Sequence, residues 1–366
     1  MLKGLRTLPT SRPGLFLVLC LFFTPLPSNA QTGSIQEFPT VFGMPQGIVA
    51  GPDGNVWLVE QASSKVAQVS PAGSLLREIA LSPGSGPLSI VVGPDGNLWF
   101  TEGGLSRIGK LSVGGALLGE FQVASPPESI AAGPDGNLWF TEESAGKIGK
   151  MDTNGRLLGE FTIPTADSKP RGISVGPCGD GNLWFTEQNG RIGRIDTAGN
   201  IAEVANTGPA SSLRGITPGP GGDCNLYIAD LGQDCIVQMT TTGLWGVIFL
   251  PIGSGPTGVI AGPDGNIWFT EKGLNRIGHM TPAGVVRPEA QVPSSQTFPD
   301  GIAVGPDANI WFTEAGGNRV GRVITGVAAP PTPTPTPTPP QGPVPQISKT
   351  VVPRRETPAP RPFRTS

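Results

Sequence analysis

An acidic residue recurs at the same place in a phrase that the chain repeats seven times, as Glu102 does in GPDGNLWFTE. Carboxylates gathered on one surface would form a site for a cation. A basic residue follows six of the seven acids across a short turn, which favours repeated cross-strand ion pairs instead. The acids are Glu60, Glu102, Glu142, Glu187, Asp230, Glu271 and Glu314, and the basic residues are Lys65, Arg107, Lys147, Arg191, Arg276 and Arg319.

A second position differs from copy to copy. It precedes the Gly or Ser that opens the first strand of each repeat, and it is occupied by Gln46, Leu88, Glu128, Arg171, Arg214, Thr257 and Asp300. Varied polar side chains that converge on one concavity are typical of a ligand site, so we predict that the six polar members bind a ligand. Arg171 and Arg214 lie on neighbouring repeats and would grip a carboxylate or phosphate. The alternative is a solvated surface without a ligand.

The only histidine is His279, in the phrase RIGHM, where other repeats have Lys or Arg. This position lies away from the variable one, so a structural role is favoured over a catalytic one. Asp230 is the one acid without a regular basic partner, because Cys235 stands where Arg is expected.

Two neighbouring repeats carry matched insertions, GPCGDGN and GPGGDCN, each with one cysteine. The insertions predict a disulfide between Cys178 and Cys224. A Cys224–Cys235 bond is disfavoured, because these residues belong near opposite ends of one hairpin. Three scattered cysteines and one histidine also argue against a zinc site.

The elements that must position these residues follow from the repeat. The Asn of the phrase falls at residues 55, 97, 137, 182, 225, 266 and 309. A period near 43 residues is typical of a four-stranded propeller blade. Each copy reads as a strand such as GIAVG (301–305), a tight PDGN turn, the apolar strand NLWFTE, a strand such as RIGKL and an outer strand such as LLGEFTIP. We therefore predict an all-β fold, a seven-bladed β-propeller.

The last repeat lacks an outer strand, because it runs from residue 301 to 325 and then into Pro-rich sequence. The segment SIQEFP (34–39) resembles the outer strand GEFTIP (159–164). The N-terminal strand is therefore predicted to complete the last blade and close the ring. The alternative is an open solenoid.

Both ends fall outside the repeats. Residues 1–30 read as a secretory signal peptide, with a basic start, an apolar run at 14–23 and a small-residue cleavage site, which predicts export to a secreted, periplasmic or cell-surface location. Residues 330–366 read as a disordered Pro/Thr-rich linker with a basic tail. The remaining 31–329 is acidic, which argues against a nucleic-acid partner. No other segment predicts a membrane span, and we expect a monomer.

The repeated phrase GPDGNLWFTE, followed by RIGK or KIGK and by GEFTIP, resembles the blades of the streptogramin B lyase (virginiamycin B lyase) family. The resemblance covers residues 34–325. It implies a magnesium-dependent enzyme that opens a cyclic depsipeptide antibiotic by elimination, with two histidines and metal-binding glutamates at the central mouth.

The family's functional residues carry over poorly. Asp300 stands at the position of the general-acid histidine, and Thr257 at that of the second histidine. Phe298 replaces an expected metal-binding Glu, whereas Glu314 matches another. The resemblance therefore implies Asp300 as the candidate catalytic residue, Glu314 as the candidate metal ligand and Mg²⁺ as the candidate cofactor.

The residues favour an exported propeller that binds a small ligand or partner at the mouth without lyase chemistry, because no histidine is present there to carry it. The alternative is a divergent magnesium-dependent carbon–oxygen lyase, or a metal-dependent hydrolase, that uses Asp300 and Glu314. A third interpretation is a surface-interaction module attached through the Pro-rich tail. Exposed apolar residues on the rim of the ring would support it.

Overall fold

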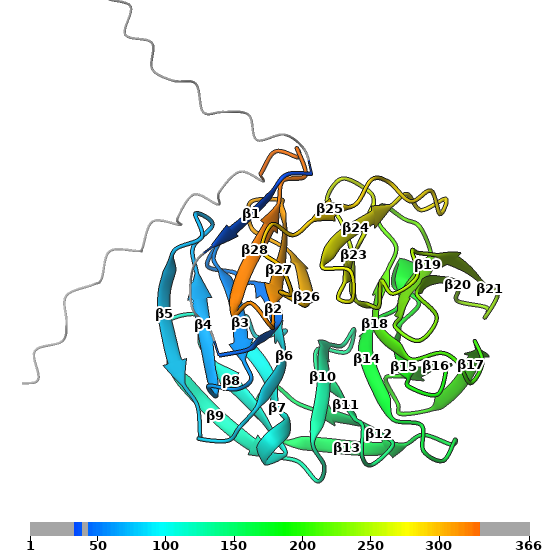
Figure 1. The fold of residues 1–366 in the computed structure, drawn as a ribbon. Coiled ribbons are helices and arrows are strands. Elements are labelled where there is room, and N and C mark those ends of the chain that lie inside the picture. The colour runs from blue at the N-terminus through cyan, green and yellow to red at the C-terminus, as the bar shows by residue number, and fades with distance from the viewer. Residues whose placement is uncertain (1–32, 39–42, 330–366) are drawn as a thin grey trace, which may run out of the picture. The chain divides into compact units, whose positions relative to one another are not determined.

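A computed structural model of the chain describes residues 33–38 and 43–329. Seven four-stranded antiparallel sheets are arranged in a ring around a central axis, as Figure 1 shows. The all-β, seven-bladed propeller predicted from the repeat is confirmed. The predicted signal peptide at 1–30 and the Pro-rich tail at 330–366 lie outside the described residues.

The strands of each blade are called A to D from the axis outward. The A strands are β2 (Pro45–Ala50), β6 (Pro87–Val92), β10 (Pro127–Ala132), β14 (Pro170–Val175), β18 (Leu213–Pro218), β22 (Pro256–Ala261) and β26 (Pro299–Val304). The B strands are β3 (Val56–Glu60), β7 (Leu98–Glu102), β11 (Leu138–Glu142), β15 (Asn182–Glu187), β19 (Asn225–Asp230), β23 (Ile267–Glu271) and β27 (Ile310–Glu314). Strand A thus begins two residues earlier than predicted and includes the variable position.

The C strands are β4 (Lys65–Val69), β8 (Arg107–Leu111), β12 (Lys147–Met151), β16 (Arg191–Asp196), β20 (Cys235–Thr240), β24 (Arg276–Met280) and β28 (Arg319–Val323). The D strands are β5 (Leu75–Ala80), β9 (Leu117–Gln122), β13 (Leu157–Thr162), β17 (Ile201–Asn206), β21 (Trp245–Phe249), β25 (Ala290–Gln291) and β1 (Ile35–Phe38). Two 3₁₀ turns, η1 (Gly103–Leu105) and η2 (Pro177–Gly179), are the only helical segments among the described residues.

The ring closes as predicted. β1, dark blue in Figure 1, pairs antiparallel with β28, orange, from Ile35 opposite Val323 to Phe38 opposite Val320. The Phe38 ring stacks on Trp311 of the same blade, with ring centroids 5.2 Å apart. The N-terminal strand thus covers the edge that blade seven would otherwise expose.

The core lies between neighbouring blades and is built from the B strands. Each B strand is buried on both faces, and Trp99 and Phe100 are fully inaccessible. Phe100 packs against Trp57 of the preceding blade, and Trp99 packs against Leu138 and Phe140 of the following one. A blade therefore supplies half of two cores, so no blade can bury its apolar residues without both neighbours.

The Asp of PDGN holds the buried tryptophan. Asp95 accepts hydrogen bonds from the backbone N–H and side chain of Asn97 and from Nε1 of Trp99, and it forms a 2.8 Å ion pair with Lys110. A buried indole N–H needs such an acceptor. The turn also needs Gly96, whose φ is +74°.

A threonine in the B strand joins each of five blades to the next. Oγ1 of Thr186 accepts from the backbone N–H of Gly172 at 2.9 Å and donates to the carbonyl of Arg214, one blade further on, at 2.7 Å. The same donation to the next blade is made by Thr101, Thr141, Thr270 and Thr313. Its acceptor is always the carbonyl of a residue at the variable position.

The predicted ion pairs are wrong in their partners. Glu102 and Arg107 are opposite each other in the register, but Arg107 pairs instead with Glu120 of the D strand, at 3.2 Å. Glu102 is fully buried, whereas the side chains of Arg107 and Glu120 keep 30% and 17% exposure. Pairing near the surface avoids the cost of stripping water from both charges. The corresponding C–D pairs are Lys65–Glu78, Lys147–Glu160, Arg191–Glu203, Arg276–Glu289 and Arg319–Glu37.

The B-strand glutamates are therefore buried beside a second carboxylate. Burial, followed by the charge of the neighbouring D-strand residue Glu120, raises the pKa of Glu102 to about 7. The same two causes raise the pKa of Glu142, Glu187, Glu271 and Glu314 to about 7. Proton uptake is thus built into most blades.

The threonine link predicts a large effect of one isosteric change. Thr186→Val leaves the N–H of Gly172 and the carbonyl of Arg214, both partly buried, without their partner, so the free energy of unfolding in urea should fall by about 1–3 kcal/mol. Thr162→Val, at an exposed D-strand position, is the control and should change it by less than about 0.5 kcal/mol. Equal effects of the two changes would contradict the link.

The buried glutamates predict a pH dependence of stability. The pKa of Glu142 is about 7 in the folded protein, well above the ordinary value of 4.5 for a glutamate. The native state therefore binds more protons than the unfolded state between these pH values, and stability falls as pH rises through 7. Glu142→Gln should remove this penalty and raise the free energy of unfolding by roughly 1–3 kcal/mol at pH 8, with little effect at pH 5.

The measurement is urea unfolding at both pH values. Asp152→Asn is the control and should leave the difference between pH 5 and pH 8 unchanged. Asp152 is a partly exposed turn residue, and backbone hydrogen bonds from Arg156 and Asn154 lower its pKa. An effect of Glu142→Gln that is the same at both pH values would rule out the proposed titration.

Candidate functional site

A cavity of about 360 Å³ opens where the A strands begin at the centre of the ring. All seven residues of the variable position line it, from seven different blades. The cavity wall also includes Ser89, Ser129, Gly172, Gly215, Leu231 and Lys272.

The backbone explains why this position reaches the cavity. In blade four the A–B register shifts between Pro170 and Ile173, which places Arg171 and Gly172 in a bulge. A Cβ at Gly172 would lie 2.5 Å from the carbonyl oxygen of Arg214, so neighbouring A strands touch through their backbones. The residue before this glycine, Arg171, has its side chain in the lining of the mouth.

The six polar residues predicted to bind a ligand therefore share one concavity. Sequence reasoning missed Leu231 and Lys272, which directly follow the last residue of strands β19 and β23. The signal was available, because the residue after the B-strand acid also varies: Gln61, Gly103, Glu143, Gln188, Leu231, Lys272 and Ala315. The mouth is thus lined by the first variable position of all seven blades and by the second one of blades five and six.

Arg171 is neutralised by acids of the preceding blade. Its guanidinium contacts Glu128 at 2.8 Å and Glu143 at 2.7 Å. Both acids come from blade three, one from each variable position.

Asp300 is also paired across blades. It accepts a hydrogen bond from Nζ of Lys272 at 2.8 Å. The two remaining polar members are engaged more weakly, Thr257 with Thr270 at 3.0 Å and Gln46 with Gln61 at 3.2 Å.

Arg214 differs from both pairs. No residue within the described ranges forms an ion pair with its guanidinium, whereas Arg171 and Lys272 both form ion pairs. Its Nε atom is buried without a hydrogen-bond acceptor among these residues, as is that of Arg171. Burial lowers its pKa, and the neighbouring charge of Arg171 lowers it further.

Glu314, the candidate metal ligand, does not line the cavity. It is fully buried within blade seven, at the end of β27, near Glu37 and Arg319. Burial is the main reason for its raised pKa. Across residues 33–38 and 43–329, no three His, Cys, Asp or Glu side chains gather in a group that could hold a metal ion. The residues present therefore do not fit a magnesium site of the kind that the resemblance implies.

His279 lies on the C strand β24, not at the mouth. Its ring stacks on Trp268 with centroids 4.3 Å apart, and burial lowers its pKa, which favours neutral imidazole. It thus replaces the cation that Lys110 places over Trp99 in blade two.

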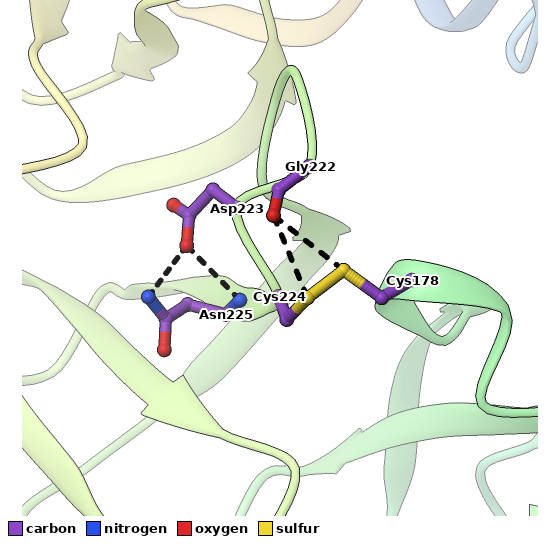
Figure 2. The surroundings of a disulfide bond; sticks show 5 residues. All are labelled: Cys178, Gly222, Asp223, Cys224 and Asn225. Carbon is purple, nitrogen blue, oxygen red and sulfur yellow. Dashed lines mark hydrogen bonds between the residues drawn. A yellow bond between two sulfur atoms is a disulfide. The ribbon is translucent and has the colours of Figure 1, made fainter.

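Cys178 and Cys224 form a disulfide with Cα atoms 5.3 Å apart, shown in Figure 2. It joins the A–B turns of blades four and five, at the end of the A strands opposite to the mouth. Both sulfurs lie near the carbonyl oxygen of Gly222. Cys235 is buried and unpaired, and Asp230 beside it accepts backbone hydrogen bonds from Ser212 and Gly232.

Comparisons with known proteins agree with this architecture. A sequence model described as "Virginiamycin B lyase family" matches residues 33–245 and 158–349. A solved streptogramin B lyase is 32% identical with a TM-score of 0.73, over 79% of this chain and 96% of that one.

Virginiamycin B lyase from Staphylococcus aureus is 30% identical with a TM-score of 0.73, over 80% of this chain and 99% of that one. A catalytically inactive form of that enzyme, solved with quinupristin, matches equally well. Comparison with curated protein sequences gave no match. The family match over most of the propeller, together with structural similarity at 30% identity or more, shows that the chain belongs to the virginiamycin B lyase family.

Proposed function

We propose that this propeller binds a small molecule at its central mouth and lacks the lyase chemistry of its family. The observation that carries the proposal is the cavity itself. Nine variable positions line the mouth: the seven at the start of the A strands, and Leu231 and Lys272 of the set that follows the B strands. The side chains at these positions vary while the scaffold repeats. A concave site with a few convergent polar groups is suited to binding.

The groups needed for elimination are missing from the mouth. A general acid or base must reach the reacting atoms, and imidazole is the group that the family uses. The single histidine of this chain is stacked on Trp268. Asp300 is occupied by Lys272, which supports a role in shaping the cavity.

The alternative proposal is a divergent magnesium-dependent lyase or hydrolase that uses Asp300 and Glu314. Its support is the family membership and the match of Glu314 to a metal ligand of the family. It requires Glu314 to ionise and a further ligand to join it.

A second candidate function is interaction with a protein or cell surface. Its support is an apolar stretch at the rim of blade five, where Leu244, Phe249 and Ile252 are 74%, 69% and 95% exposed. Apolar residues gathered on a rim are typical of an interaction surface.

Export remains part of the proposal. The predicted signal peptide supports it, and a disulfide between Cys178 and Cys224 suits an oxidising compartment. Among the described residues, no helix is long and apolar enough to cross a membrane.

The proposal predicts that the purified protein leaves quinupristin intact in the presence of Mg²⁺. Liquid chromatography with mass spectrometry should show no linear product of unchanged mass, while the Staphylococcus aureus enzyme, as positive control, converts the antibiotic fully. Product formation that disappears in EDTA and in Glu314→Gln would overturn the binding-only proposal. Loss in Asp300→Asn as well would assign the acid, and a product heavier by one water would identify a hydrolase.

A further inference from the structure

We propose that the ligand of the mouth carries an oxyanion, a carboxylate or a phosphate, and that Arg214 is the residue that binds it. This inference rests on the proposed function and gives the ligand a chemical class. It is carried by the contrast between Arg214 and the other charged residues of the cavity.

Each cation of the cavity except Arg214 has its acid within the ring. Glu128 and Glu143 neutralise Arg171, and Asp300 neutralises Lys272. These pairs cross from one blade to the next. Glu128 and Glu143 stand at the two variable positions of the blade before that of Arg171. At the same two positions of the blade before that of Arg214, the chain has Arg171 and Gln188. The acids that would neutralise Arg214 are therefore replaced by a cation and an amide.

The backbone of Arg214 is held in place by contacts that do not depend on a ligand. Its carbonyl accepts the Thr186 hydroxyl, and Gly215 next to it packs on the backbone of Thr257. The Nε of Arg214 is buried with no acceptor in the described part of the chain, and the largest charge effect on this residue is that of Arg171. The carboxylates of Glu128 and Asp300 act on it more weakly, and each is already paired with another cation. An oxyanion bound by the guanidinium fork would supply that acceptor and offset the repulsion between the two arginines.

The rest of the wall defines the body of the ligand. Leu88 and Leu231 supply apolar surface, and Gln46 and Thr257 supply neutral polar groups. A cavity of about 360 Å³ is suited to a small organic molecule. The predicted ligand is a compact acid with an apolar body.

The test is calorimetric titration of the mature protein with benzoate, inorganic phosphate and neutral benzamide as probes. At least one anion should bind, benzamide should bind at least about tenfold more weakly than benzoate, and added chloride should weaken anion binding. Arg214→Gln should lower anion affinity by at least about tenfold. Arg194→Gln is the matched control and should retain native affinity. Arg194 lies on the C strand β16, and its guanidinium lies over the Trp184 ring, away from the mouth.

The outcomes separate the two levels of proposal. Stronger binding of benzoate than phosphate identifies a carboxylate ligand, and the reverse order a phosphate. Binding of benzamide as tight as that of benzoate, unchanged in Arg214→Gln, would overturn the oxyanion inference and keep a ligand-binding mouth. Absence of binding by all three probes would overturn it as well. Thermal unfolding of Arg214→Gln shows whether the variant is folded, and we expect it to melt no lower than the native protein.

Discussion

Burial of the B strand on both faces is the constraint on which the rest of the structure depends. A strand such as β7 has no face for water, so its polar groups must be satisfied inside the protein. Asp95 satisfies the indole of Trp99, and Thr101 carries its hydroxyl bond across to the next blade. Glu102 at the end of the strand has no ion-pair partner among the described residues, because Arg107 pairs with Glu120, and burial raises the pKa of Glu102 to about 7. The repeated phrase is the sequence record of these three solutions.

The mouth varies because the scaffold holds it by its backbone. The threonine bond ends on the carbonyl of Arg214, and the neighbouring glycine packs on the next blade. Neither contact involves the side chain, so the residue type at this position can differ from blade to blade while the backbone contacts stay the same. The same logic explains how a fold shared with an antibiotic lyase can have a cavity without that enzyme's histidines.

Much of this could be predicted from the sequence because period and local pattern carry it. The spacing between residues such as Asn97 and Asn137 predicted the length and number of the blades. The similarity of residues 34–39 to an outer strand predicted that the N-terminal strand closes the ring. The partner of Arg107 could not be read in the same way. Strand C lies between B and D, and only burial decides that the diagonal Glu120 is preferred over Glu102. Lys272 could have been found, because the residue after the B-strand acid differs from repeat to repeat. Its partner could not, because the pairing with Asp300 joins two blades and a pattern within one repeat does not show it.

Closure by β1 also has a consequence for the order in which the strands of the ring can pair during folding. Residue 38 must meet residue 320, so the first strand to leave a ribosome or a translocation pore waits for nearly the whole propeller before it finds its partner. Blade seven stays incomplete until then, with the edge of β28 open to any other extended segment. Such a distant contact slows folding. Until β1 pairs, the edge of β28 can accept the equivalent strand of a second copy, so closure by a distant segment also opens a route to strand exchange between two copies.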